Sequence, residues 1–229
     1  MKVALLSFTP EPDKLCAACA LGCHSKDAAS YIYKTLTDKR IRSVLRNTVS
    51  RGHWSVIEHA CFTFGVEGVS RSLTHQLVRH RIASFSQQSQ RYVPQSDPDY
   101  VTPPTIARDP TIKAVFENQV NEAWTTYAAL RRRGVPAEDA RFVLPNATRS
   151  SIAITMNARE LRHFFELRCC IVAQWEIREM AEMMLVEVQR VAPAIFERAG
   201  PSCASGSCPE RMDDCPLRST YAIKQDLCR

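Results

Sequence analysis

The chain has 229 residues, of which 45% are apolar and 24% charged, enough to bury a substantial core. Its 30 basic and 24 acidic residues give a net charge of +6, which suits anionic small molecules or nucleic acid as partners. No stretch of about 18 apolar residues and no secretory signal occurs, so the sequence excludes a membrane span and predicts a cytoplasmic protein.

The first part of the chain predicts a strand, two helices, a second strand and a third helix. In chain order, these elements cover residues 1–9, 14–23, 27–49, 61–66 and 70–80. Ser25 or Asp27 is the expected cap of the second helix, and Ser70 that of the third.

The second part predicts a long extended loop followed by helices and one strand. The loop runs from Ile82 to Pro110 and is longer than packing alone favours, which is typical of functional segments. After it we expect helices over 113–133 and 136–144, a strand over 148–156, and helices over 158–170 and 175–191. The pattern indicates an α+β fold rich in helix, with one domain over 1–200 and a cysteine-bearing tail over 201–229.

The segment RHRIASFSQQSQR, residues 79–91, predicts an anion site. No Asp or Glu occurs between Gly68 and Ser96, whereas four arginines do. Guanidinium groups bind phosphate oxygens in a bidentate manner, and the serines of the segment supply neutral donors. A solvated basic helix end is the alternative for a lone RHR. The chain has no GxGxxG motif and no P-loop, so a nucleotide must be held in another way.

The same segment resembles the signature of the flavin-dependent thymidylate synthases, in which RHR is followed by seven residues and a serine. Here that pattern runs from Arg79 to Ser89. The resemblance covers roughly residues 1–200 and extends to GHWSVIEH, to NARELRHFFELR and to AQWEIR. One position departs from it, because Ser86 stands where family members commonly carry asparagine.

The resemblance implies a fold, a reaction and an assembly. The fold would be a single domain with an antiparallel sheet and packed helices. The reaction would be the reductive methylation of dUMP to dTMP, with FAD as cofactor and with NADPH and methylenetetrahydrofolate as co-substrates. The assembly would be a homotetramer with sites at subunit interfaces, with no nucleic acid and no membrane as partner.

The resemblance also implies the site residues. The flavin would contact Ser55, Arg79, His80, Arg81, Ile82, Gln87, Asn157, Ala158, Arg159 and His163. The substrate dUMP would contact Gln76, Leu77, Val78, Arg79, Gln87, Gln88, Ser89, Gln90, Arg91, Arg141 and Arg168. Arg168, usually supplied by a neighbouring subunit, would stabilise negative charge on the uracil ring and is the expected electrostatic catalyst. Ser89 would orient the substrate by hydrogen bonding, since the sequence offers no adjacent base to activate it.

The spacing of residues on the predicted helix over 158–170 agrees with two ligands binding to opposite faces of that helix. Arg159, His163 and Leu167 are spaced four residues apart and share a face, whereas Arg168 lies on the opposite side from Arg159. A surface helix with an exposed arginine and an apolar seam would show the same spacing and is the alternative.

The ten cysteines are expected to be reduced thiols. Cys61, Cys169 and Cys170 lie in apolar contexts, which predicts buried and inert thiols. Two further groups, Cys16–Cys19–Cys23 and Cys203–Cys208–Cys215–Cys228, are spaced more loosely than the usual zinc motifs, so we assign no metal ligands. A zinc or iron-sulfur site in a metal-stapled structural protein remains one alternative to the enzyme, and a nucleic-acid binding module that uses the basic segment is the other.

Overall fold

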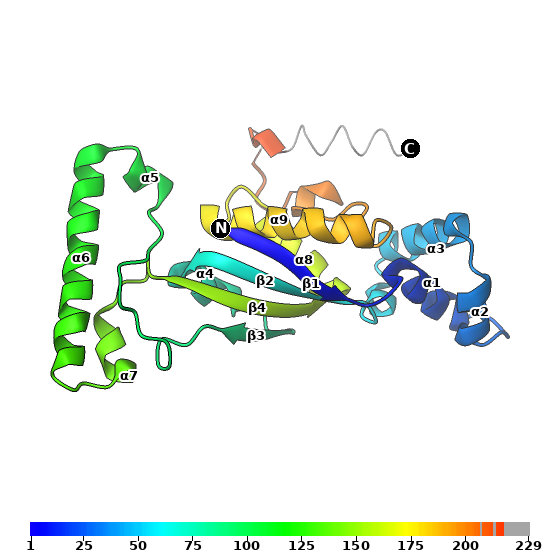
Figure 1. Ribbon diagram of the computed structural model, residues 1–229. Helices are drawn as coiled ribbons and strands as arrows, with labels where there is room; N and C mark the ends of the chain where they lie inside the picture. Colours follow the sequence, from blue (N-terminus) through cyan, green and yellow to red (C-terminus); the bar gives the residue numbers. More distant parts are fainter. Residues whose placement is uncertain (207, 213, 218–229) are drawn as a thin grey trace. The chain divides into compact units, whose positions relative to one another are not determined.

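The computed structural model describes residues 1–206, 208–212 and 214–217. Its strands β1 (Lys2–Phe8), β2 (Cys61–Ser70), β3 (Ala83–Gln87) and β4 (Arg149–Asn157) form a sheet in the order β1-β2-β4-β3 (Figure 1). The sheet is antiparallel and the chain is rich in helix, which confirms the predicted α+β architecture. No helix of the described residues is long and apolar enough to cross a membrane.

The chain divides into two compact units. Unit 1 comprises Met1–Lys2, Val66–Arg79 and Ser86–Ala153, and unit 2 comprises Val3–Gly65, His80–Phe85 and the described residues from Ile154 onward. Each strand contributes residues to both units. The predicted boundary between residues 200 and 201 stays a prediction.

Unit 2 is built from helices around an aromatic core. In chain order its helices are α1 (Pro12–Gly22), α2 (Ala29–Thr35), α3 (Asp38–Ser50), η1 (Trp54–Ile57), α8 (Ala158–Arg168), α9 (Trp175–Val191) and η3 (Ser202–Ala204). Helix α1 packs on α2 and α3, and α8 packs on α9. The fully buried rings of Phe62, Phe165 and Phe196 meet edge to face, with centroids 5.5 and 6.0 Å apart, a favoured arrangement for aromatic pairs.

The predicted long helix over 27–49 is wrong, because the chain forms two helices there. Leu36 is extended and ends α2, and Thr37 then caps α3 by accepting the backbone N–H of Arg40. The apolar residues on either side of the break keep helical spacing, which is why periodicity alone predicts one helix. The expected caps Ser25 and Asp27 are not used, since α2 begins after Ala28.

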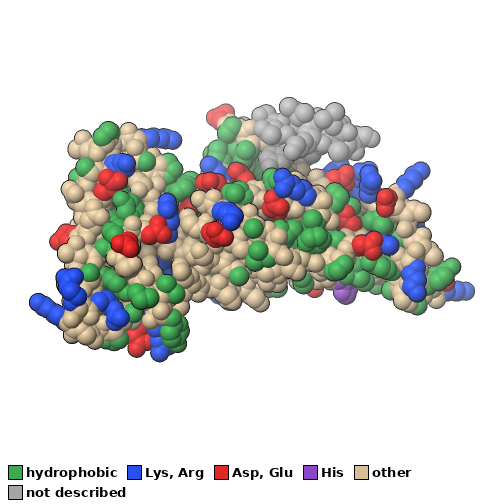
Figure 2. Space-filling view, viewed as in Figure 1, with side chains coloured by type: hydrophobic (Ala, Val, Ile, Leu, Met, Phe, Trp, Pro, Cys, Tyr) green, Lys and Arg blue, Asp and Glu red, His purple; other side chains and the backbone are tan. Residues whose placement is uncertain are grey.

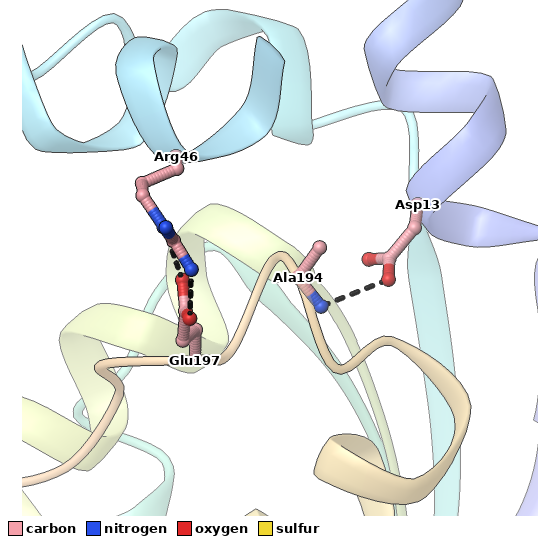
Figure 3. Close-up of polar contacts among 4 residues, drawn as sticks. All are labelled: Asp13, Arg46, Ala194 and Glu197. Atoms are coloured by element: carbon pink, nitrogen blue, oxygen red, sulfur yellow. Dashed lines mark hydrogen bonds and ion pairs between the residues drawn. The ribbon is translucent and has the colours of Figure 1, made fainter. Parts of the chain in front are cut away.

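Polar contacts hold α1 and α3 against the segment that follows α9 (Figure 3). The Asp13 carboxylate accepts the backbone N–H groups of Ala194 at 2.9 Å and of Ile195 at 3.0 Å. Burial raises the pKa of Asp13, and these two hydrogen bonds lower it in part. Arg46 of α3 binds both carboxylate oxygens of Glu197, at 2.7 and 3.1 Å. These contacts join α1 and α3 to residues 194–197, which follow α9.

Unit 1 is organised around one long helix. Its helices are α4 (Arg71–Leu77), α5 (Pro104–Ala107), α6 (Pro110–Arg132), α7 (Ala137–Ala140) and η2 (Arg141–Val143). Val120, Trp124 and Tyr127 form the buried face of α6, and α5 and α7 lie at its two ends (Figure 1). Basic side chains gather at the end of α6 (Figure 2), where Arg131 and Arg132 suit the negative pole of the helix dipole.

The remaining predicted elements are confirmed, with one exception, although the helix over 136–144 forms as the short α-helix α7 followed by the 3-10 helix η2. The side chain of Ser70 caps α4 as expected by accepting the N–H of Leu73. The exception is the predicted loop from Ile82 to Pro110, which contains the strand β3 and the short helix α5. The polar sequence of β3 hides it, because β3 lies at an edge of the sheet and pairs only with β4.

Candidate functional site

Three arginines gather in unit 1 around the start of α7. Arg91 forms an ion pair with the carboxylate of Glu138, and the Arg141 guanidinium donates to the backbone carbonyl of Glu138 at 3.0 Å. The pKa of Arg71 is lowered, first by burial and then by the charge of Arg141, so Arg71 lies close to Arg141. Among these four side chains, three guanidinium groups face one carboxylate, so positive charge is in excess.

The segment from Gln87, the last residue of β3, to Arg91 is held by hydrogen bonds. The Gln87 side-chain amide donates to the hydroxyls of Thr74 and Ser150, both at 3.1 Å. Gln88 pairs through its backbone with Ser151. The Ser89 hydroxyl accepts the backbone N–H of Arg91 at 3.2 Å, which closes a turn. The segment is therefore a defined structure and not an open loop.

Other predicted dUMP residues of unit 1 differ in burial. Leu77 is fully buried and packs in the core, whereas Val78 and Arg79 are exposed where α4 ends. Gln76 is partly exposed on α4. Gln90 is 6% exposed, and its side-chain nitrogen has no hydrogen-bond partner among the described residues. A buried amide of this kind is costly unless a ligand or water completes it.

Unit 2 contains a pocket of about 480 Å³ at the start of α8. The pocket is lined by Trp54, Glu58, Ile82, Asn157, Arg159, Glu160, His163 and Glu166. Four of these residues, Ile82, Asn157, Arg159 and His163, are among those that the family resemblance assigns to flavin. Asn157 is also the N-cap of α8, since its side-chain oxygen accepts the N–H of Glu160 at 2.9 Å. Arg159 forms an ion pair with Glu58.

The other predicted flavin residues do not line this pocket. Ser55 and Arg81 are exposed and adjoin the pocket residues Trp54 and Ile82 along the chain. Ala158 is fully buried, and its N–H donates to the carbonyl of Ala60 at 2.8 Å, which fixes the start of α8. Of the remaining three, Arg79 and Gln87 belong to unit 1, and His80 belongs to unit 2 but does not line the pocket.

His80 lies buried between two charged residues of α8. Its Nδ1 is 3.2 Å from a carboxylate oxygen of Glu160, and its Nε2 is 3.1 Å from Nε of Arg168. The ring also meets Phe164 edge to face at 5.0 Å. Burial, and then the charges of Arg168 and His163, lower the pKa of His80 to about 4, so the ring is neutral near pH 7.

Comparison with known proteins identifies the family. A family model described as thymidylate synthase complementing protein matches residues 4–194. This chain belongs to that family.

Relatives within the family are similar over nearly the whole chain. A flavin-dependent thymidylate synthase of Geobacter sulfurreducens is 50% identical over 212 residues, which cover 92% of this chain and 91% of that protein. One of Clostridium tetani is 45% identical over 231 residues, covering 94% and 93%.

A solved structure shares the fold. The crystal structure of a UMP/dUMP methylase PolB from Streptomyces cacaoi bound with 5-Br dUMP has a TM-score of 0.75 and 24% identity to this chain. The similarity covers 86% of this chain and 93% of that one. At 24% identity, the comparison shows that the two chains share a fold.

Sequence reasoning missed five residues at these sites, two of which are the pocket residues Glu58 and Glu166. Glu138 contacts two of the arginines in unit 1, Glu160 contacts His80, and Trp54 lines the pocket. A signal for Glu160 exists, because Asn157 followed by a glutamate three residues later is typical of a capped helix start. Glu138 and Trp54 carry no such local pattern.

The cysteines differ from expectation at two positions, Cys61 and Cys170. Cys169 is buried as predicted, with a pKa raised to about 12 by burial, and such a thiol is inert. Cys61 is exposed instead, because the first side chain of β2 points outward, and Cys170 is only partly buried. Cys203, Cys208 and Cys215 line a small pocket with Cys170, but no group of three metal-ligating side chains stands ready among the described residues. Cys228 lies outside the described residues.

Proposed function

We propose that this chain is a flavin-dependent thymidylate synthase that converts dUMP to dTMP. In the full reaction, dUMP, methylenetetrahydrofolate, NADPH and a proton yield dTMP, tetrahydrofolate and NADP⁺. Membership of the family over residues 4–194 carries the proposal, together with 50% identity to a curated relative of that name. The same membership favours an enzyme over a nucleic-acid binding module or a metal-stapled structural protein.

The arginines of unit 1 suit the phosphate of dUMP. Arg91 and Arg141 present guanidinium groups around Glu138, and Arg71 adds a third. The excess of positive charge among these side chains suits a phosphate dianion, and guanidinium groups bind phosphate in a bidentate manner. Because Glu138 already pairs with Arg91, the phosphate competes with that carboxylate for the same donors. Glu138 would hold the arginines apart before the substrate binds.

The pocket of unit 2 suits a flavin. Trp54 and Ile82 provide apolar surface for a planar ring, and Asn157, Arg159 and His163 provide polar groups at its edge. A volume of about 480 Å³ lies within the range of cofactor pockets, roughly 300–1,000 Å³. When bound there, FAD supplies hydride transfer, which no amino-acid side chain can perform. The residues of the chain hold and orient the ring.

Arg168 is the proposed catalytic residue. Its guanidinium is always charged, and Nε is used to bind His80, so the two terminal nitrogens are left to face a ligand. As C5 of uracil becomes nucleophilic, negative charge develops on the ring oxygens, and a fixed cation stabilises it. In a homotetramer, this residue would come from a neighbouring subunit.

The proposal includes a homotetramer in the cytoplasm. Large apolar side chains stand exposed in unit 1, with Tyr92 75% and Phe142 83% exposed, and contacts between subunits would cover such groups. Light scattering coupled to size-exclusion chromatography measures the assembly directly. A monomer at micromolar concentration would contradict this part of the proposal alone.

The release of tritium from dUMP labelled at C5 tests the function. We expect release with FAD, NADPH and methylenetetrahydrofolate together, and its loss when any one of them is omitted. Replacing FAD by FMN and NADPH by NADH in parallel identifies the cofactor and the reductant. A folded, flavin-loaded protein that releases no tritium would overturn the proposal.

A further inference from the structure

The buried glutamate of α8 has no role in the reaction described above, although it is only 6% exposed. A carboxylate is rarely buried unless a partner compensates it. The partner of Glu160 is Nδ1 of His80, which is itself 3% exposed. The ring of His80 is shielded from water, whereas Glu160 also lines the pocket at the start of α8. The pair therefore requires an explanation in structure or in function.

The direction of each hydrogen bond follows from the chemistry of Arg168. A guanidinium group has only donors, so the Nε–H of Arg168 donates to Nε2 of His80, which must carry no proton. The proton of a neutral imidazole then sits on Nδ1, and Nδ1–H donates to the Glu160 carboxylate. The three side chains form one directed chain from Arg168 through His80 to Glu160.

The helix places both ends of this chain on one face. Glu160, Phe164 and Arg168 are spaced four residues apart, so their side chains follow one another along α8. His80 bridges the two outer residues, and the Phe164 ring supports it at 5.0 Å. Glu160 is also the third residue of α8, where the positive end of the helix dipole favours a carboxylate.

We propose that Glu160 and His80 are positioning residues, which fix the orientation of the Arg168 guanidinium for the reaction of dUMP. With Nε held by His80, the plane of the guanidinium is set, and its terminal nitrogens keep one direction. Glu160 holds the His80 ring in the tautomer that accepts from Arg168. The inference rests on the proposed function, because that function gives Arg168 its role.

Variants of Glu160 separate positioning from packing. In Glu160→Gln the side-chain oxygen still accepts from Nδ1–H, so we expect kcat for tritium release within about threefold of wild type. In Glu160→Ala the acceptor is lost, and we expect kcat to fall by about ten- to hundredfold, the effect of a misplaced catalytic group. KM for dUMP should change little, and flavin titration of each variant shows whether the pocket that Glu160 lines still binds FAD. Glu179→Ala, an exposed glutamate of α9, is the matched control.

The tautomer gives a readout that does not depend on activity. In protein labelled with ¹⁵N-histidine, two-bond ¹H–¹⁵N correlation spectra distinguish the two neutral tautomers, and the chain has only six histidines. We expect one ring in the Nδ1–H form in wild type and in Glu160→Gln, with its signal absent in His80→Gln. We expect that signal to be lost or averaged in Glu160→Ala.

Each outcome decides the inference. An active wild type in which Glu160→Ala retains full kcat, or in which His80 carries its proton on Nε2, would overturn it. Equal loss of kcat in the Gln and Ala variants would also overturn it, because the acceptor would then not matter. A wild type without tritium release would instead overturn the proposed function. Thermal unfolding of each variant shows whether lost activity reflects lost folding. If Glu160→Ala does not fold, the kcat of Glu160→Gln and the tautomer of His80 in wild type test the inference instead.

Discussion

The two units handle charge in opposite ways. In unit 1, Arg71, Arg91 and Arg141 surround a single carboxylate, and a net positive charge remains at a partly exposed surface. In unit 2, the buried ring of His80 is neutral and is held between one cation and one carboxylate. Excess charge attracts an anion from a distance, whereas a balanced buried chain holds one group in one place. The first arrangement serves binding and the second serves orientation.

The largest expected effect comes from removing the guanidinium group of Arg168 in unit 2. Arg168→Ala should lower kcat by about 10²- to 10³-fold, as the loss of one electrostatic stabiliser does in other enzymes. Binding of FAD should remain, because Arg168 does not line the pocket at the start of α8. Stopped-flow kinetics and flavin titration measure the two quantities. Parallel loss of flavin and activity would contradict the assignment, and Arg190→Ala, on the exposed side of α9, is the control.

A smaller effect, on substrate binding and not on the chemical step, is expected from a substitution in unit 1. Arg91→Ala should raise KM for dUMP by about ten- to hundredfold, the effect of losing one charge-assisted contact of 1.5–3 kcal/mol, and leave kcat nearly unchanged. Its KM should also depend less on salt than that of wild type. Initial rates at two ionic strengths measure both. Arg108→Ala, an exposed residue at the end of α5, should behave as wild type, and an unchanged KM in Arg91→Ala would refute the phosphate role.

The neutral state of His80 predicts a dependence of stability on pH. Its pKa is lowered from 6.5 to about 4 in the folded protein, so between these values the unfolded chain binds the proton and the folded chain does not. The contribution of His80 to the free energy of unfolding therefore falls as pH decreases, by about 2 kcal/mol between pH 7 and pH 5. The groups that face the ring are Arg168, His163 and Glu160.

Urea unfolding at the two pH values, in wild type and in His80→Gln, measures this contribution. The difference between the two proteins isolates the histidine from the other titrating groups. An identical pH dependence in both would show that His80 titrates normally in the folded protein.

The smallest expected effect tests the start of α8. Asn157→Ala removes the cap of that helix and should lower the free energy of unfolding by about 1 kcal/mol. Asn157→Asp keeps an acceptor oxygen and should retain most of the stability. Chemical denaturation of the two variants gives the comparison. Equal stability of the Ala variant and wild type would mean that tertiary packing alone holds the helix in place.

Much of the fold could be predicted from the sequence, since long periodic segments dominate it. The helices α8 and α9 and the strand β4 follow from spacing, and the cap at Ser70 follows from residue type. The strand β3 could not be predicted, because its pairing with β4 and not its own residues defines it.

Residues of the candidate site could be predicted from the sequence only where they match motifs of the family that the chain resembles. The resemblance leads to Arg91, Arg141 and Arg168, but not to the glutamates near them. Glu138 is close in sequence to Arg141 but far from Arg91, and Glu160 is 80 residues from His80. Spacing along the chain carries no information on such contacts. Their discovery required the folded structure.

The bond between Asp13 and Ala194 also sets an order of events during synthesis. The two residues are 181 positions apart, and Arg46 and Glu197 are 151 apart, so α1 and α3, which pack on each other, gain these polar partners only after residues 194–197 have been synthesised. Unit 1, by contrast, is complete at Ala153. Its long helix is therefore available to fold before α1 and α3 gain these contacts, and a chain that stalls before residue 197 lacks the bonds that tie them to the segment after α9.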